Sequence, residues 1–247
     1  MNIIGIIPAR FASTRFPGKP LVEIFGKSMI QRVIEQTKKC SLLKDVIVAT
    51  DDERIFNHVV SLGTPVFMTS AEHPSGTDRC LEAYKASGIT AEAIINIQGD
   101  EPFVDPIQIE TLCHLISKTD VDIATLAKHI EDMETLMDPN KVKVIFDASG
   151  KAIYFSRHAI PFQKGTPQSQ WLEHFKYFKH LGLYAYKTAV LEEICQFLPS
   201  SLELAESLEQ LRWLENGKAI YLAETDRETP AIDTPADLEK VLRDYTN

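Results

Sequence analysis

The chain has 247 residues, of which 44% are hydrophobic and 25% charged. This composition is typical of a globular protein and excludes a disordered or fibrous one. The formal net charge of −9 argues against a protein that coats nucleic acid or binds a membrane surface. Four widely spaced cysteines form no CxxC pair, and we find neither a signal-peptide pattern nor a membrane-spanning apolar stretch. We therefore expect a reduced cytoplasmic protein.

The first half of the chain alternates predicted strands with predicted helices. A run of isoleucines at 3–7 predicts a strand that is buried on both faces, and Ser28 is a predicted helix N-cap. Further strands are expected at 46–49, 65–68 and 93–97, and further helices around 55–60, 77–86 and 107–116. This alternation indicates βαβ units and a parallel sheet covered by helices.

The pattern changes after about residue 120. Strands are predicted at 122–128, 142–146, 152–156 and 181–186, with a turn at 147–150 and a polar loop at 163–169. A helix over 202–215, a strand over 219–223 and a final helix from Pro235 complete the chain. Without repeats or a flexible linker, we expect one α/β domain over 1–247, with a strand-rich excursion at about 140–188.

The loop after the first strand, residues 8–20, carries three cations, Arg10, Arg15 and Lys19. It has one glycine and matches neither GxGxxG nor a Walker loop. In a doubly wound sheet, ligands bind beyond the carboxyl ends of the strands, where this loop lies. A solvated basic loop is the alternative, but the position after a buried strand favours phosphate binding by side chains.

Two aspartates are candidate metal ligands. Asp100 follows a predicted buried strand, and Mg²⁺ prefers carboxylate and phosphate oxygens. The alternative is an aspartate that serves only a turn. Asp233 lies just before the last helix. On the simplest interpretation it only supports the start of that helix.

Other polar residues are ambiguous when they are considered alone. Ser75 precedes a predicted helix and is readily explained as its N-cap. His180, Glu209 and Gln210 would be ordinary surface or helix residues. Arg157 ends a strand, where bidentate binding of a carboxylate is feasible.

Eight segments resemble, in the same order, the motifs of the CMP-Kdo synthetase (3-deoxy-manno-octulosonate cytidylyltransferase) family. The opening segment PARFASTRFPGKPL at 8–21 carries the strongest resemblance. The other segments are 48–52, 73–79, 96–102, 154–157, 180–184, 208–212 and 232–235. The first loop is also similar to that of other nucleotidyltransferases, but the later motifs favour the Kdo branch over the sialic-acid branch.

The resemblance implies a Rossmann-like nucleotidyltransferase sandwich that uses Mg²⁺, CTP and Kdo to make CMP-Kdo for lipopolysaccharide biosynthesis. It assigns catalysis to Arg10, Arg15 and Lys19, and the metal to Asp100 and Asp233. The implied nucleotide-binding residues are Pro8, Ala9, Arg10, Lys19, Ser75, Gly76, Arg79 and Gln98. The implied sugar-binding residues are Arg157, His180, Tyr184, Glu209 and Gln210. It also implies a homodimer formed through the excursion.

The chemistry implied is attack of the anomeric hydroxyl of Kdo on the α-phosphate of CTP, with loss of pyrophosphate. No dedicated base stands out in the sequence, so activation of the hydroxyl by the metal is the preferred account. Ala231, where the family usually has glycine, is a departure beside Asp233. A cytidylyltransferase for another acidic sugar and a catalytically idle nucleotide-binding module are the alternatives; the intact set of cations and carboxylates argues against the second.

Overall fold

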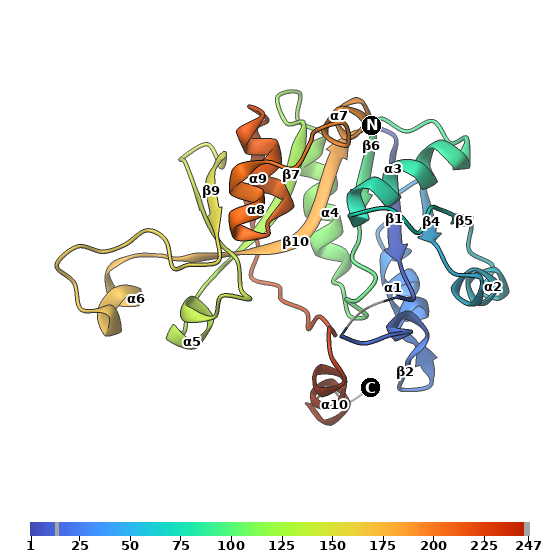
Figure 1. Cartoon of the computed structure of the whole chain (residues 1–247), viewed down its shortest axis with the longest axis horizontal. Helices are drawn as coiled ribbons and strands as arrows, with labels where there is room; N and C mark the ends of the chain where they lie inside the picture. Colours follow the sequence, from blue (N-terminus) through green and yellow to red (C-terminus); the bar gives the residue numbers. More distant parts are fainter. Residues whose placement is uncertain (13–14, 245–247) are drawn as a thin grey trace.

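The computed structural model describes residues 1–12 and 15–244, and in this part of the chain nine strands form one mixed sheet (Figure 1). The path through the sheet is β11-β7-β10-β6-β1-β4-β5, and β8 pairs with both β10 and β9. The strands of the path are β1 (Ile3–Ala9), β4 (Asp45–Thr50), β5 (Val66–Met68), β6 (Ala93–Asn96), β7 (Ile123–His129), β10 (Phe178–Lys187) and β11 (Ile220–Glu224).

The parallel half of the sheet places the carboxyl ends of its strands at one edge. β1 pairs in parallel with β4 and with β6, and β4 pairs in parallel with β5. β10 then runs antiparallel between β6 and β7, and β11 returns parallel to β7. This arrangement confirms the predicted Rossmann-like sandwich with a mostly parallel sheet and an antiparallel excursion.

Helices cover both faces of the sheet, as the alternation predicts. One buried cluster contains side chains of α1 (Met29–Thr37), α2 (Glu53–Ser61) and α4 (Pro106–Ile116). The other contains side chains of α3 (Gly76–Ser87), α7 (Thr188–Ile194) and α9 (Glu209–Glu215). Both clusters include strand side chains, because each central strand is apolar on both of its faces. Among the described residues, no helix has the length and apolar character needed to cross a membrane.

The predicted helix over 202–215 was wrong, because two helices stand there. α8 (Ser201–Glu206) and α9 meet at Ser207, which has a left-handed backbone with φ of 52°. The guanidinium of Arg157 donates to the carbonyls of Glu206, at 2.6 Å, and Ser207, at 3.1 Å. A distant arginine thus binds carbonyl groups that a helix end leaves without partners.

The excursion forms an arm that extends from the sheet (Figure 1). β8 (Lys143–Phe146) and β9 (Ala152–Ser156) form the predicted hairpin, and Gly150 in its turn has a φ of 83°. The arm has its own small core, which joins α5 (Met133–Met137) and α6 (Trp171–His174) and consists of Ile130, Leu136, Ala159, Trp171 and Tyr177. A 3-10 turn, Gln168–Gln170, overlaps the end of the predicted polar loop.

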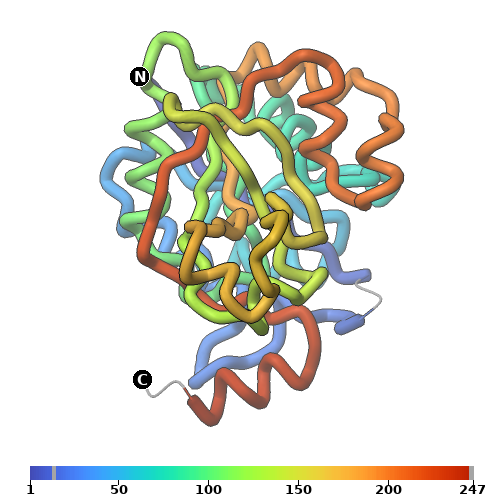
Figure 2. Tube along the Cα trace, turned by 90° about the vertical axis from the view of Figure 1, so that its left-hand side faces the viewer, coloured from blue at the N-terminus to red at the C-terminus, as the bar shows by residue number. Residues whose placement is uncertain are grey.

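The last helix, α10 (Pro235–Asp244), lies against the N-terminal part of the chain, below the sheet in Figures 1 and 2. Buried Ile232 and Val241 pack with Ile24 and Met29 in a separate cluster. Ile24 belongs to a short hairpin of β2 (Glu23–Ile24) and β3 (Lys27–Ser28), which follows the 3-10 turn Lys19–Leu21. This small lobe, the α10 lobe, joins the two ends of the chain beside the carboxyl end of β1.

Shortening Val241 to alanine tests whether the α10 lobe is held by its own small core. The substitution removes two methyl groups from a side chain that is 3% exposed, at a cost of about 1–2 kcal/mol. We expect the protection of α10 amides from hydrogen exchange to fall about tenfold while β1 and β6 stay protected. The matched control is Leu242→Ala, since Leu242 is 43% exposed on the same helix. Equal loss of protection in the sheet would show that the lobe does not open separately.

Candidate functional site

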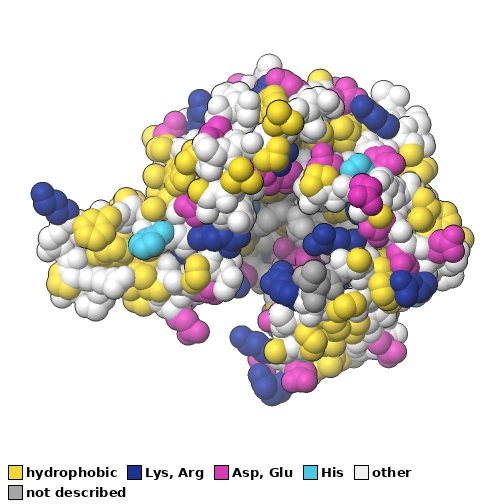
Figure 3. Space-filling model, in the orientation of Figure 1, with side chains coloured by type: hydrophobic (Ala, Val, Ile, Leu, Met, Phe, Trp, Pro, Cys, Tyr) yellow, Lys and Arg dark blue, Asp and Glu magenta, His cyan; other side chains and the backbone are white. Residues whose placement is uncertain are grey.

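A cleft of about 310 Å³ opens at the carboxyl ends of β1 and β6, between the α10 lobe and the start of α3. Figure 3 shows a hollow on this face with Lys and Arg side chains around it. The lining residues include each residue that the sequence assigns to nucleotide, catalysis or metal: Pro8, Ala9, Arg10, Arg15, Lys19, Ser75, Gly76, Arg79, Gln98, Asp100 and Asp233. His73, Pro74, Pro20 and Gly99 complete it. The structure thus brings these separate motifs together.

Lys19 links the two candidate metal ligands directly. Its Nζ donates to Asp100 Oδ2 at 2.7 Å and to Asp233 Oδ1 at 3.1 Å. A terminal nitrogen of Arg15 lies 3.2 Å from the same Asp233 oxygen. Two carboxylates from distant parts of the sequence therefore converge on one point, which the Lys19 ammonium occupies.

Backbone contacts explain why Asp233 reaches Asp100. The amide of Ile232 donates to the carbonyl of Asp100 at 2.9 Å, and the Ile232 side chain is fully buried. Asp237 accepts from the amides of Asp233 and Thr234, at 3.1 and 2.8 Å, which caps the start of α10. Ala231 does not have a positive φ, so alanine in place of the usual glycine introduces no backbone strain beside Asp233.

The floor of the cleft depends on a close approach of two loops. A Cβ on Gly99 would lie 2.6 Å from the carbonyl oxygen of Pro8, so only glycine fits between β6 and the cationic loop. Gly18, with a φ of 72°, turns this loop back so that its amide donates to the Phe11 carbonyl at 2.9 Å. The guanidinium of Arg54 lies over the Phe11 ring, 3.3 Å from its centroid. Lys19 is thereby directed into the cleft.

The side of the cleft opposite the α10 lobe consists of the start of α3 and the end of β6. Ser75 is the N-cap of α3 and accepts from the amide of Asp78 at 3.2 Å. Arg79 is buried and pairs with Asp51 at 2.8 Å. The amide nitrogen of Gln98 donates to the carbonyl of Gly182 at 2.9 Å. The N-cap interpretation of Ser75 is thus correct, and it leaves Ser75 at the edge of the cleft as well.

The predicted sugar residues do not line this cleft; they belong to β10, to α9 and to the residue that follows β9. His180 and Tyr184 lie on β10, with ring centroids 5.2 Å apart, and Gln98 contacts the same strand through Gly182. His180 Nε2 is 2.9 Å from the hydroxyl of Thr125. Burial lowers the pKa of His180 to about 3, so its ring is neutral at physiological pH. The hydroxyl of Tyr184 is buried without a hydrogen-bond partner among the described residues.

The remaining sugar candidates come from the arm and from α9. Arg157 uses three of its N–H groups on the carbonyls of Pro139, Glu206 and Ser207. Glu209 accepts from the Thr77 hydroxyl at 2.8 Å, and burial raises its pKa. Gln210 follows Glu209 and is buried. Thr77 therefore ties this group to the helix start that borders the cleft.

Sequence reasoning named His73, Pro74 and Asp51 only as members of motifs. His73 lines the cleft and pairs with Glu82, nine residues further along the chain. Asp51 holds the guanidinium of Arg79. Only their positions in segments 48–52 and 73–79, which resemble family motifs, could have identified them. A charge pair between residues far apart in the sequence leaves no local sequence pattern.

The donor set fits a magnesium ion. Among residues 1–12 and 15–244, no group of three or more His, Cys, Asp or Glu side chains is arranged to hold a metal. Mg²⁺ commonly takes only one or two carboxylates and fills its other positions with water and phosphate oxygens. Asp100 and Asp233 match this pattern, since both carboxylates contact the Lys19 ammonium and therefore lie close together.

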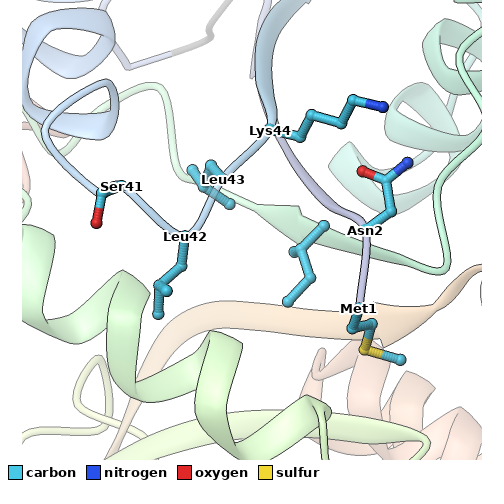
Figure 4. Close-up of a pocket in the computed structure, with 7 residues that line it drawn as sticks. Met1, Asn2, Ser41, Leu42, Leu43 and Lys44 are labelled. Atoms are coloured by element: carbon cyan, nitrogen blue, oxygen red, sulfur yellow. The ribbon is translucent and has the colours of Figure 1, made fainter.

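A second depression lies at the opposite end of β1 and is lined by Met1, Asn2, Ile3, Ser41, Leu42, Leu43 and Lys44 (Figure 4). Its side chains are mainly apolar, and Lys44 is the charged one in its lining. It contains none of the residues that the sequence singles out. We therefore place the functional site at the cleft.

The neutral, half-buried His180 predicts a pH dependence of stability. An unfolded histidine has a pKa near 6.5, against about 3 in the fold. Below pH 6.5 the imidazole of His180 binds a proton in the unfolded chain but stays neutral in the folded chain, so acidification favours unfolding. Between pH 7.5 and 5.5, His180 should cost the fold about 1.4 kcal/mol.

Urea unfolding of His180→Gln at both pH values should show a pH effect smaller by that amount. The exposed His174 gives the control His174→Gln, which should leave the pH effect unchanged. An identical pH effect in His180→Gln and the parent protein would contradict the neutral ring.

Comparison with known proteins agrees with this geometry. The family described as Cytidylyltransferase matches residues 4–220. A 3-deoxy-manno-octulosonate cytidylyltransferase from Cytophaga hutchinsonii is 53% identical over 242 residues, which are 98% of this chain and 96% of the relative. The enzyme of the same name from Parabacteroides distasonis is 53% identical over all of this chain and 99% of its own.

Solved structures give the same result. The CMP:2-keto-3-deoxy-manno-octonic acid synthetase complexed with CTP has a TM-score of 0.91 and 40% identity, and the match covers 98% of both chains. A cytidylyltransferase from Leptospira borgpetersenii, with a TM-score of 0.64 and 16% identity over all of this chain and 89% of its own, shares the fold. With its sequence motifs, its sheet and its relatives in agreement, this chain belongs to the 3-deoxy-manno-octulosonate cytidylyltransferase family.

Proposed function

We propose that the protein transfers CMP from CTP to the anomeric hydroxyl of Kdo, giving CMP-Kdo and pyrophosphate. The observation that carries this proposal is the meeting of Lys19 with Asp100 and Asp233 in a cleft bordered by the cationic loop and the start of α3. Relatives that share half of the sequence bear the name of this activity, and a structural neighbour holds CTP.

The cleft suits a nucleoside triphosphate. Arg10, Arg15 and Lys19 supply three cations along one wall, and Arg10 is exposed to solvent in the cleft. A unit charge pair at 4 Å contributes about 1 kcal/mol in water but about 4 at an effective dielectric of 20. Cations at the mouth of a cleft therefore stabilise the growing phosphate charge far better than cations on an open surface.

We assign the base and ribose to the opposite wall. Ser75 and Gly76 begin α3 there, and a helix N-terminus presents free amides to polar groups of a ligand. The buried pair of Arg79 and Asp51 fixes this wall. Gln98 is anchored to Gly182 through its amide nitrogen, so its side-chain oxygen remains available to the nucleotide.

We assign Mg²⁺ to Asp100 and Asp233. When bound, the ion supplies charge neutralisation at the phosphates and polarises oxygen ligands. The chain's own contribution is to hold the two carboxylates together through the contact of Ile232 with Asp100. Among the described residues that line the cleft, no side chain stands out as a dedicated base, so we assign the chemistry to orientation and electrostatics.

We place Kdo beside the cleft, against β10 and α9. Arg157 keeps two of its five N–H donors after its three carbonyl contacts, and a guanidinium binds a sugar carboxylate with such a pair. Neutral His180, the unpaired Tyr184 hydroxyl, Glu209 and Gln210 offer the polar contacts that sugar hydroxyls need.

We further infer that residues 1–247 act as one cytoplasmic domain that forms a homodimer through the excursion at about 140–188 and supplies lipopolysaccharide biosynthesis. The exposure of large apolar side chains on the arm supports the dimer. Phe162 is 74% exposed, Ile153 59% and Phe175 42%. A dimer interface on the arm would remove these side chains from water.

Release of pyrophosphate tests the proposed function. With Mg²⁺ and CTP, Kdo should support turnover, whereas replacing CTP by UTP or ATP should reduce kcat/KM by at least about tenfold, the loss expected for contacts worth 1.4 kcal/mol. Sialic acid and an amino-substituted Kdo in place of Kdo test the alternative that another acidic sugar is used. Turnover with sialic acid equal to that with Kdo, or none with any sugar, would contradict the proposal.

Replacing Asp100 by asparagine tests the metal assignment. The substitution keeps the shape but removes a charged oxygen ligand, so the Mg²⁺ concentration for half-maximal activity should rise by about tenfold or more. Asp226→Asn makes the same change on a side chain that is 95% exposed and should leave the titration unchanged. An unaltered Mg²⁺ titration in Asp100→Asn would refute the assignment.

A further inference from the structure

Lys19 has no free donor in this structure. An ammonium group has three N–H donors, and Nζ of Lys19 contacts three acceptors: Asp100 Oδ2 at 2.7 Å, Asp233 Oδ1 at 3.1 Å and the carbonyl of Ile232 at 3.4 Å. The side chain is only 13% exposed. Lys19 cannot donate to a phosphate while it keeps all three contacts.

Lys19 occupies one oxygen of each carboxylate that we assign to the metal. Asp100 Oδ2 and Asp233 Oδ1 both bind the ammonium, and Arg15 binds the same Asp233 oxygen at 3.2 Å. Two carboxylates are therefore matched by two cations. A free divalent ion added here would meet a neutral cluster and the fixed charge of Lys19, which opposes its entry.

A triphosphate changes this balance. It carries several negative charges and many acceptor oxygens, so it offers the Lys19 ammonium a better partner than two aspartates, one of which, Asp233, is already shared with Arg15. Withdrawal of Lys19 toward the phosphates frees both carboxylates for a cation. One movement of a single side chain thus exchanges an ammonium for a metal.

We propose that Lys19 is a placeholder cation, which excludes a free divalent ion from Asp100 and Asp233 until a nucleotide draws it away. The inference rests on the proposed function, since it takes these carboxylates as the metal site. The enzyme then binds metal and nucleotide as one unit, and the absence of nucleotide leaves the site closed to metal. By linkage, each of the two ligands strengthens the binding of the other.

Mn²⁺ binding without nucleotide tests the placeholder, because a nucleotide would itself chelate the ion. Free Mn²⁺ is measured by electron paramagnetic resonance in the presence of the parent protein, Lys19→Met, Lys19→Arg and Lys27→Met. Lys27 provides the control, since it is an exposed lysine that pairs with Glu35 away from the cleft. A second readout is the melting temperature of each protein with and without Mn²⁺.

Lys19→Met should bind Mn²⁺ at least about tenfold more tightly than the parent protein, because the competing charge is gone. Its melting temperature should be lower without the ion and should rise when Mn²⁺ is added. Lys19→Arg keeps a cation at the site and should behave like the parent protein, as should Lys27→Met.

Equal Mn²⁺ affinity of the parent protein and Lys19→Met would overturn the placeholder. If that shared affinity is lost in Asp100→Asn, the metal site of the proposed function stands and only the placeholder fails. If Lys19→Met binds no Mn²⁺ and Asp100→Asn also leaves the Mg²⁺ titration of activity unchanged, the assignment of the metal site itself is wrong. Tight binding by Lys19→Met that disappears in Lys19→Met/Asp100→Asn supports both.

Discussion

The ion cluster of Lys19, Asp100 and Asp233 is the interaction on which the rest of the site depends. It joins the loop after the first strand, the end of β6 and the start of the last helix, which lie far apart in the sequence. Two carboxylates at one point repel each other, so a cation between them stabilises the folded site. The exchange of one cation for another is thus a natural way to couple the binding of ligands to the site.

The sheet provides the rigid support for this cluster. β1 and β6 are parallel neighbours whose apolar side chains are buried on both faces, so their carboxyl ends deliver Arg10 and Asp100 to the same edge. The α10 lobe then adds Asp233 through a small core and one backbone contact with Asp100. The strands of the sheet thus position Arg10 and Asp100, and the smaller core of the α10 lobe positions Asp233.

Much of this arrangement was predictable from the sequence, and the exceptions have physical causes. Buried isoleucines and the alternation of strands and helices predicted the central strands, and the resemblance brought Asp233 together with Asp100. The break at Ser207 was missed because the carbonyls there are bound by Arg157, a contact across 50 residues. The placing of Lys19 between the carboxylates was also missed, since it depends on three distant segments meeting.

The most direct test of the central claim is a crystal structure of the protein with CTP and Mn²⁺, in which anomalous scattering locates the ion. We expect an anomalous peak within coordination distance of Asp100 and Asp233, with Nζ of Lys19 moved from the carboxylates to the phosphates. A peak elsewhere, or an ion bound while Lys19 still contacts both carboxylates, would contradict it.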